Sequence, residues 1–308
     1  MHQSSGRWQL GLFLSLLTAF LWGVLPVALK GILQDMDATT ITWYRFTVAV
    51  LLMAIFLKNK KMMPDFRWLK QKKQSFLFAL VGFGLAGNYL LYLMGLDLIT
   101  PSAAQIVIQL APLLLLIGGL VIFRERFNLF QWAGLFIFLT GLVLFFNHRL
   151  DSIFSSSSSY SWGLLLVFFA AITWAGYALA QKQLLLHYSS QQIMFIVYLV
   201  GALIFLPWID FSAITNLTSL QLGLLLFCCL NTLVAYGSFA EALEHWEASR
   251  VSAVLAVTPL ITMGCAAITQ YYFPDYLQVE ELNWLSIVGG LILVVGASLT
   301  ALSRSKRN

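Results

Sequence analysis

The chain has 308 residues, of which 60% are hydrophobic and only 10% are charged. Soluble domains carry about 25% charged residues, so this composition excludes an ordinary soluble fold and indicates a membrane protein. The formal net charge is +5. Because the basic residues gather in short segments between apolar runs, as topology anchors do, we expect no nucleic-acid partner.

A membrane-spanning helix needs about 20 predominantly apolar residues, and ten runs approach that length. They lack the alternating pattern of a membrane barrel, and non-helical backbone cannot face lipid, so the expected fold is an all-α polytopic membrane protein with ten transmembrane helices. In chain order the runs cover residues 9–33, 39–57, 75–96, 101–123, 129–147, 161–186, 190–208, 220–243, 248–273 and 284–302.

The distribution of Lys and Arg predicts the orientation. With the N-terminus in the cytoplasm, only Lys30, Arg45 and Arg149 fall outside the inner segments. Cytoplasmic loops carry an excess of basic residues, so the sequence predicts a multi-pass protein with cytoplasmic N- and C-termini.

The two halves of the chain repeat the same plan. Trp22 corresponds to Trp174, and Pro112 to Pro259. Each half has five predicted helices, an odd number, so the second half must enter the membrane upside down. We expect a first repeat (1–150, helices 1–5), a Ser-rich linker (151–160) and a second repeat (161–308, helices 6–10). Inverted repeats of this kind carry a substrate site near the bilayer midplane.

A set of short motifs recurs in order along the chain: Trp22-Gly23, Pro26, Tyr44-Arg45-Phe46, Asn88-Tyr89, Ser102-Ala103-Ala104 and Pro112, then Trp174, Tyr236, Ala242-Leu243, Ala248-Ser249 and Pro259. Their order resembles the drug/metabolite transporter superfamily, in its ten-helix form with two EamA repeats. There are departures, because Val197 stands where the first repeat has Arg45, and Gln270 begins the turn after the ninth span, where a glutamate is usual. The resemblance implies an inner-membrane carrier of small metabolites, often an exporter of amino acids or related compounds, with a central cavity walled by helices 1, 3, 4, 6, 8 and 9.

Polar and aromatic side chains near the middle of the spans are the candidate substrate-binding residues. Such groups face a cavity or pair across helices, and the sequence leaves open that they only hold helices together. The candidates are Trp22, Asn88, Tyr89, Gln105, Gln109, Trp174, Tyr177, Asn231, Tyr236 and Thr258.

The fourth predicted helix contains the densest group of candidates. Gln105 and Gln109 are four residues apart and share one helix face, close to Pro112. Proline frees the carbonyl one turn back, here that of Ile108, and this carbonyl with a glutamine amide could hold an amino or carboxyl group. Pro112 and Pro259 are candidate gating residues.

Two charged residues within spans have separate interpretations. Arg45 is predicted to be structural or gating, with Asp37 or Asp97 in reach, before substrate-binding. Glu241 is a candidate coupling residue, since burial can raise the pKa of a glutamate toward neutrality. The alternative for Glu241 is an ion pair with Lys182, Arg250 or His245. Lys30 and Lys182 are expected to be anchors at span ends, with their stems along the apolar surface.

The sequence favours a secondary active transporter that exports amino acids or related neutral or zwitterionic metabolites by alternating access. No nucleotide-binding loop is present, so the energy would come from an ion or substrate gradient. The alternatives are a gradient-driven facilitator or exchanger of other organic solutes and, more remotely, a non-transporting receptor or scaffold.

We expect no enzyme activity, because the histidines lie at span ends or termini without catalytic spacing. The cysteines lie in apolar runs, and we expect no metal site and no cofactor. The expected partners are a small-molecule substrate, membrane lipid and protons as the coupling ion, in a monomer or weak homodimer of the bacterial inner membrane.

Overall fold

The computed structural model describes residues 7–65, 71–123, 128–149, 158–246, 248–277 and 282–302, and these contain helices and no strand. All ten predicted spans are helical. The helices are α1 (Trp8–Ile32), α2 (Ala38–Asn59), α3 (Lys72–Leu98), α4 (Pro101–Ile108), α5 (Leu110–Phe123), α6 (Leu129–Phe145), α8 (Ser159–Leu184), α9 (Ser190–Phe205), α10 (Ala213–Asn216), α11 (Ser219–His245), α12 (Ala248–Leu255), α13 (Thr258–Tyr272) and α14 (Trp284–Leu302), with short 3-10 turns at Asn147–Arg149 and Leu206–Trp208.

Eight of the helical segments are long and apolar enough to cross a membrane. The apolar segments Pro101–Leu115 and Leu129–Phe145 are shorter, and they correspond to the fourth and fifth predicted spans. The all-helical membrane fold expected from the sequence is therefore confirmed. Most of the predicted Ser-rich linker lies outside the described residues, and its last two positions already belong to α8, which begins at Ser159.

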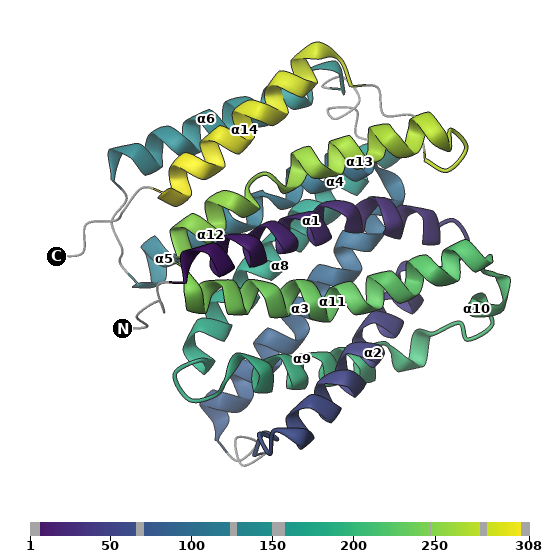
Figure 1. Ribbon diagram of the computed structural model, residues 1–308, viewed down its shortest axis with the longest axis vertical. Helices are drawn as coiled ribbons and strands as arrows, with labels where there is room; N and C mark the ends of the chain where they lie inside the picture. The colour runs from purple at the N-terminus through teal and green to yellow at the C-terminus, as the bar shows by residue number, and fades with distance from the viewer. Residues whose placement is uncertain are drawn as a thin grey trace.

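Each helix of the first half packs against a helix of the second half (Figure 1). The helix α3 lies along α8, and α11 lies along α1. The pairs α2–α9 and α6–α14 form opposite edges of the bundle. Exchanging the two halves turns the pair α3–α8 into the pair α11–α1, so the packing has the two-fold pattern of an inverted repeat.

The edge pair α6–α14 is held at close range by glycines. A Cβ atom on Gly141 would lie 2.4 Å from the nitrogen of Leu293, and one on Gly289 would lie 2.4 Å from the nitrogen of Phe145. Both blocking atoms belong to the backbone, which cannot rotate away. Small residues that let helix backbones approach are the usual basis of helix packing in membranes.

The fourth and ninth predicted spans are each broken near the middle, at repeat-related positions. The helix α4 ends with Gln109 as its C-cap, and α5 begins at Leu110. In the second half, α13 begins at Thr258 with Pro259 in its first turn. Each proline removes a backbone donor and frees a carbonyl one turn back, which explains two half-helices where the sequence predicted one continuous helix.

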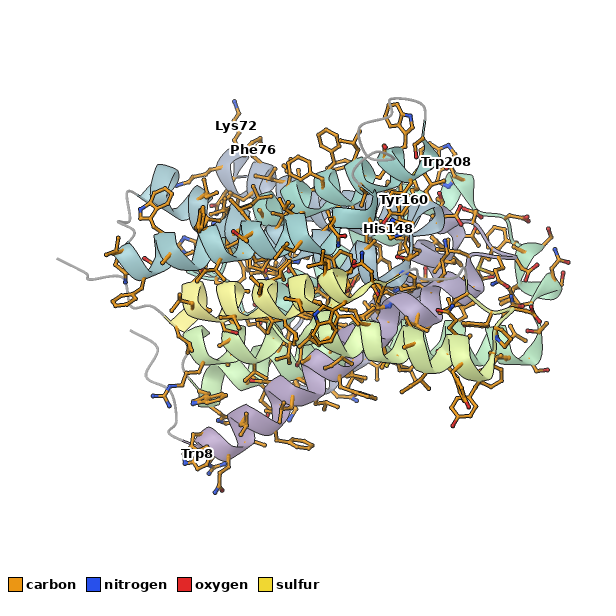
Figure 2. All side chains as sticks on the ribbon, turned by 90° about the horizontal axis from the view of Figure 1, so that it is seen from above. Trp8, Lys72, Phe76, His148, Tyr160 and Trp208 are labelled. Carbon is orange, nitrogen blue, oxygen red and sulfur yellow. The ribbon has the colours of Figure 1, made fainter. Side chains whose placement is uncertain are left out.

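The outer surface of the bundle is apolar, and aromatic side chains mark its two ends (Figure 2). Trp8 and Phe76 project near one end and Trp208 near the other, with 55%, 66% and 68% of their surfaces exposed. Trp and Tyr concentrate at both membrane–water interfaces. The position of these residues at the two ends thus fits a bundle whose helices cross a bilayer.

Candidate functional site

A cavity of about 590 Å³ lies at the centre of the bundle. Most of its wall comes from α1, α3, α4, α5, α8, α11, α12 and α13. These helices correspond to the predicted spans 1, 3, 4, 6, 8 and 9, which were expected to enclose the cavity. Of the fourteen candidate residues, eleven line it: Trp22, Arg45, Asn88, Tyr89, Gln105, Gln109, Pro112, Trp174, Asn231, Tyr236 and Thr258.

Corresponding positions of the two repeats line the same cavity. The sequence alignment of the halves, extended along each helix, pairs lining residues with lining residues. The pairs are Trp22 with Trp174, Tyr89 with Tyr236, Tyr92 with Phe239, Gln105 with Ser252, Ile108 with Leu255, and Gln109 with Ala256. The cavity thus lies on the axis that relates the two repeats, where transporters with inverted repeats bind their substrates.

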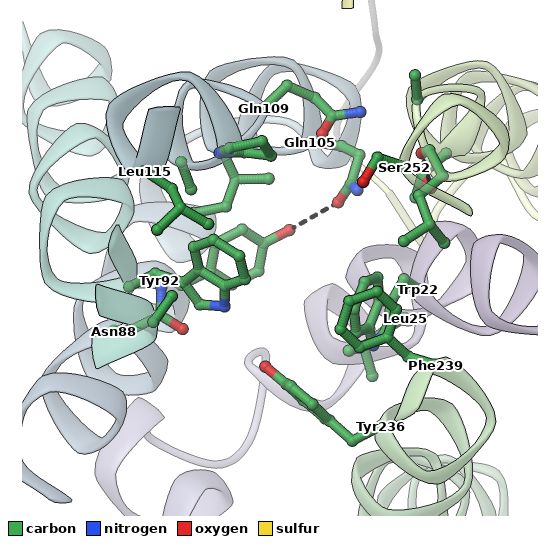
Figure 3. A pocket seen from close by; sticks show the side chains of 18 of the residues that line it. Trp22, Leu25, Asn88, Tyr92, Gln105, Gln109, Leu115, Tyr236, Phe239 and Ser252 are labelled. Carbon is green, nitrogen blue, oxygen red and sulfur yellow. Dashed lines mark hydrogen bonds between the residues drawn. The ribbon is translucent and has the colours of Figure 1, made fainter. Parts of the chain in front are cut away.

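One wall of the cavity is aromatic. The ring centroids of Trp22 and Tyr236 lie 5.3 Å apart in an edge-to-face arrangement, and those of Trp22 and Phe239 lie 5.7 Å apart. Figure 3 shows these three side chains together, with Tyr236 pointing into the open space. Aromatic pairs of this geometry stabilise each other by about 0.5–1.5 kcal/mol beyond simple burial, so the wall is a preformed surface.

The two candidate asparagines connect helices from within the cavity wall. Asn88 donates from Nδ2 to the carbonyl of Ala170, and Asn231 donates from Nδ2 to the carbonyl of Leu21, both at 2.8 Å. Their amides therefore join the repeats in the pairs α3–α8 and α11–α1. Both asparagines also line the cavity. Each one therefore both faces the cavity and connects two helices, the two roles that the sequence left open.

The amide side chains of α4 border the same space. Tyr92 donates its hydroxyl to Oε1 of Gln105 at 3.3 Å, the contact drawn in Figure 3. Among the described residues that line the cavity, two side-chain atoms are buried without a hydrogen-bond partner: Nε2 of Gln109 and Oδ1 of Asn231. A buried unpaired polar atom costs about 1–3 kcal/mol.

The carbonyl freed by proline is hydrogen-bonded to a side chain in the second repeat, and the first repeat lacks that side chain. Thr258 donates its hydroxyl to the carbonyl of Leu255 at 2.5 Å, which is the carbonyl freed by Pro259. Ala111 stands at the corresponding place in the first repeat and has no hydroxyl to give to the carbonyl of Ile108. The Ile108 side of the cavity therefore offers an acceptor that the second repeat has already satisfied.

Arg45 is buried in the cavity wall, with 3% of its surface exposed. Its Nε donates to the hydroxyl of Thr232 at 3.1 Å, and its guanidinium carbon lies 4.4 Å from the centre of the Tyr89 ring. Neither aspartate expected from the sequence is among the described hydrogen-bond or ring partners of Arg45, and the carboxylate of Asp37 caps α2 instead. A charge at membrane depth costs about 2.5–3.5 kcal/mol on insertion scales.

Three candidates lie outside the cavity lining: Tyr177, Glu241 and Pro259. Tyr177 is buried and points its hydroxyl at the sulfur of Met194, 3.1 Å away. The side chain of Glu241 is 59% exposed, and an oxygen of it lies 3.8 Å from Nε2 of His245, one of the ion-pair partners weighed above.

The cavity is open at one end of the bundle and closed at the other. At the open end its lining includes Lys182 and Ser252, both exposed. At the closed end it stops at Leu29 and Leu93, which belong to a buried apolar cluster with Leu96 and Ile99. The open end is the one where α1 begins and α14 ends (Figure 1).

Lys30 differs from its predicted role as an anchor reaching for water. It is buried, and its Nζ donates to the carbonyls of Leu96 and Asp97 in the last turn of α3, at 2.9 and 2.6 Å. Cations stabilise helix C-termini because the last carbonyls lack partners within the helix. Its repeat counterpart Lys182 lines the open end instead.

Tyr92, a weaker candidate from the sequence, also lines the cavity. Lining residues that the sequence did not propose for the cavity include Lys182, Thr232, Phe239 and Ser252. Repeat correspondence would have found two of them, since Phe239 matches Tyr92 and Ser252 matches Gln105. Nothing in the local sequence marks Thr232, which acts through Arg45.

Comparison with known proteins identifies relatives over the whole chain. Residues 9–147 and 161–302 each match the EamA-like transporter family. A Haemophilus influenzae protein named as an uncharacterized transporter is 42% identical over 293 residues, covering 95% of each chain. The Escherichia coli K12 inner membrane transporter YhbE, also named as uncharacterized, is 36% identical over 302 residues, covering 98% of this chain and 93% of its own.

More distant matches agree in extent. A Salmonella typhimurium protein named as a probable amino-acid metabolite efflux pump is 24% identical over 300 residues, covering 92% of each chain. A solved crystal structure superposes with a TM-score of 0.64 and 16% identity over 94% of each chain, a likeness of fold. The two family matches and the identity to these transporters show that the chain belongs to the EamA-like transporter family and is an integral inner-membrane transporter.

Proposed function

We propose that the protein is a secondary active exporter of small metabolites, most simply amino acids or related neutral or zwitterionic compounds, working by alternating access. The observation that carries the proposal is the central cavity lined by corresponding residues of both repeats, such as Trp22 with Trp174 and Tyr89 with Tyr236. Two copies of one plan around a shared site can exchange roles, which is how inverted repeats produce two access states.

The size and lining of the cavity support a small organic substrate. Ligand pockets usually measure about 300–1,000 Å³, and the cavity of about 590 Å³ falls in that range. Its aromatic wall and the amides of Gln105, Gln109 and Asn231 suit a solute with an apolar body and a few polar groups. The name of the Salmonella relative, an efflux pump for amino-acid metabolites, is in keeping with this class.

The proposed topology places both termini in the cytoplasm, each repeat forming one domain of five spans joined by the Ser-rich linker. The exposed lysines Lys58, Lys60, Lys61, Lys72 and Lys73 lie at the α2–α3 turn, on the side where α1 begins. This agrees with the basic excess of cytoplasmic loops. With that orientation, the open end of the cavity faces the cytoplasm, the side from which an exporter loads.

The coupling mechanism has two candidates. Glu241 is the proposed coupling residue of a proton-driven exporter. Against it, no Asp or Glu is among the described residues that line the cavity, and the Glu241 side chain is 59% exposed. This observation favours the second candidate, a facilitator or exchanger driven by the substrate gradient.

The test is uptake into proteoliposomes from a radiolabelled pool of amino acids and small metabolites, with and without an imposed pH gradient. Three proteins are compared: the wild type, Gln109→Ala in the cavity, and Gln71→Ala as a control. Gln71 is an exposed N-cap residue of α3 whose side chain makes no capping bond.

Uptake lost in Gln109→Ala and retained in Gln71→Ala would support a carrier with a central site. Accumulation that depends on the pH gradient would support proton coupling, and uptake independent of it would leave the facilitator or exchanger. Folded protein that moves none of the pool would contradict the proposed substrate class.

A further inference from the structure

Arg45 is a buried cation without a described counter-charge. Among the described residues, none supplies a carboxylate that forms an ion pair with its guanidinium. Its partners are the neutral hydroxyl of Thr232 and the ring of Tyr89. Both orient the guanidinium without neutralising it. Ionised residues within membrane spans are expensive, and they mark substrate or ion pathways when they face a cavity.

The described lining of the cavity contains no acidic residue that could balance Arg45, because no Asp or Glu is among the described residues that line it. Arg45 lies beside the central aromatic residues. A positive charge in a cleft with low-dielectric walls attracts solutes of the opposite sign.

We propose that the substrate enters with a carboxylate and that Arg45 binds this carboxylate directly. The inference rests on the proposed transport function and redefines its substrate class as carboxylate-bearing compounds, which are zwitterionic or anionic. Amino acids and organic acids belong to this class, and amines without a carboxylate do not.

The geometry around Arg45 suits this role. The guanidinium presents its donors in a planar fork that matches a carboxylate with two parallel hydrogen bonds. The bond from Nε to Thr232 uses one donor of five and fixes the plane of the group. The ring of Tyr89 at 4.4 Å holds that plane from the side.

The cavity also has an acceptor for an amino group on the same substrate. The carbonyl of Ile108, freed by Pro112, belongs to a lining residue. A zwitterion would therefore find donors for its carboxylate and an acceptor for its ammonium in one cavity.

The experiment compares matched acids and amides on purified full-length protein in detergent. The pairs are leucine with leucinamide, phenylalanine with phenylalaninamide, and phenylacetate with phenylacetamide, so that each pair differs in the carboxylate. Binding is measured by calorimetry and by the shift in melting temperature. The same compounds are then tested for transport in proteoliposomes.

We expect at least one acid to bind tenfold or more tightly than its amide, and Arg45→Gln to abolish that preference. Arg45→Lys keeps the positive charge but loses the planar pair of guanidinium donors, so the preference of this variant for acid over amide should be intermediate. Arg7→Gln, at the exposed arginine that precedes α1, should leave the preference unchanged. Thr232→Val provides a second variant if Arg45→Gln fails to fold, and should weaken acid binding severalfold without changing amide binding.

Equal binding of acids and amides, binding of none of the acids, or a preference that survives Arg45→Gln would overturn the inference. Failure of the proposed function is distinguishable from these outcomes. Acid-selective binding without transport would refute transport and leave the carboxylate site, whereas transport of amides at the same rate as acids would refute only the carboxylate site.

Discussion

The ammonium group of Lys30 donates a hydrogen bond of 2.6 Å to the main-chain oxygen of Asp97 and a second, of 2.9 Å, to that of Leu96. The two bonds fasten the end of α1 to the end of α3 where the cavity is closed. Lys182, which matches Lys30 in the second repeat, lines the cavity where it is open. The matching lysines of the two repeats therefore have different contacts: Lys30 joins two helices at the closed end of the cavity, and Lys182 lines the open end.

Lys30→Met should shift the protein toward the state that is open at this end. It removes two charge-assisted bonds, each contributing about 1.5–3 kcal/mol, while Met keeps most of the apolar stem. The measurement is labelling of a cysteine introduced at Leu93 by an impermeant maleimide, in a background without the native cysteines. We expect faster labelling from the α1–α3 end in Lys30→Met.

Lys182→Met is the matched control for this experiment. It removes the corresponding lysine from the open end, so it should not raise labelling at Leu93. Equal labelling of the wild type and Lys30→Met would show that the two bonds do not hold this end closed.

Gly141→Ala should destabilise the protein through the α6–α14 edge. Its new Cβ would meet the backbone of Leu293 at 2.4 Å, and forced overpacking costs about 1–3 kcal/mol. The melting temperature in detergent measures this effect. Gly264→Ala is the control, because its added Cβ would have no heavy atom within 4 Å apart from the adjacent backbone of its own helix. Helix propensity alone should raise stability there by about 1 kcal/mol. A Gly141→Ala protein as stable as Gly264→Ala would contradict the close approach.

The spans could be predicted from the sequence because their causes are local. Length and hydrophobicity define each helix, whereas the breaks near Pro112 and Pro259 fall within spans that were each predicted as one continuous helix. Trp22 and Trp174 could be predicted as cavity residues from their repeat positions. Predicting these features requires only the local sequence around each residue, or the corresponding position in the other repeat.

The contacts between helices could not be predicted in the same way. Arg45 was expected to reach an aspartate, but its partner Thr232 is 187 residues away. Lys30 was expected to reach water, but backbone carbonyls accept its hydrogen bonds, and a sequence does not show which carbonyls end near it. Tyr177 was a cavity candidate, yet its place on α8 turns the hydroxyl to Met194, a direction set by how the helices pack.

Trp22→Ala and Trp174→Ala should each weaken transport, and by similar amounts, if the two repeats build one site. An aromatic contact contributes about 0.5–1.5 kcal/mol beyond the burial of its area, so we expect KM to rise by at least about twofold to twelvefold. Kinetics of uptake in proteoliposomes measure this change. Trp208→Ala is the control, since that side chain is 68% exposed at the end of the bundle. A large effect of Trp22→Ala with none of Trp174→Ala would assign the site to one repeat.

A coupling role for Glu241 predicts a selective defect in Glu241→Gln. The variant should lose accumulation driven by a pH gradient, because the glutamine cannot carry a proton. It should keep the exchange of labelled for unlabelled substrate, because Glu241 lies outside the cavity lining. His245→Gln is the matched variant, since His245 lies 3.8 Å from Glu241 and would change the ion pair without removing the carboxylate. If Glu241→Gln accumulates substrate as the wild type does, the coupling role is excluded, and the cavity without a described acidic residue is best explained by exchange or facilitated transport.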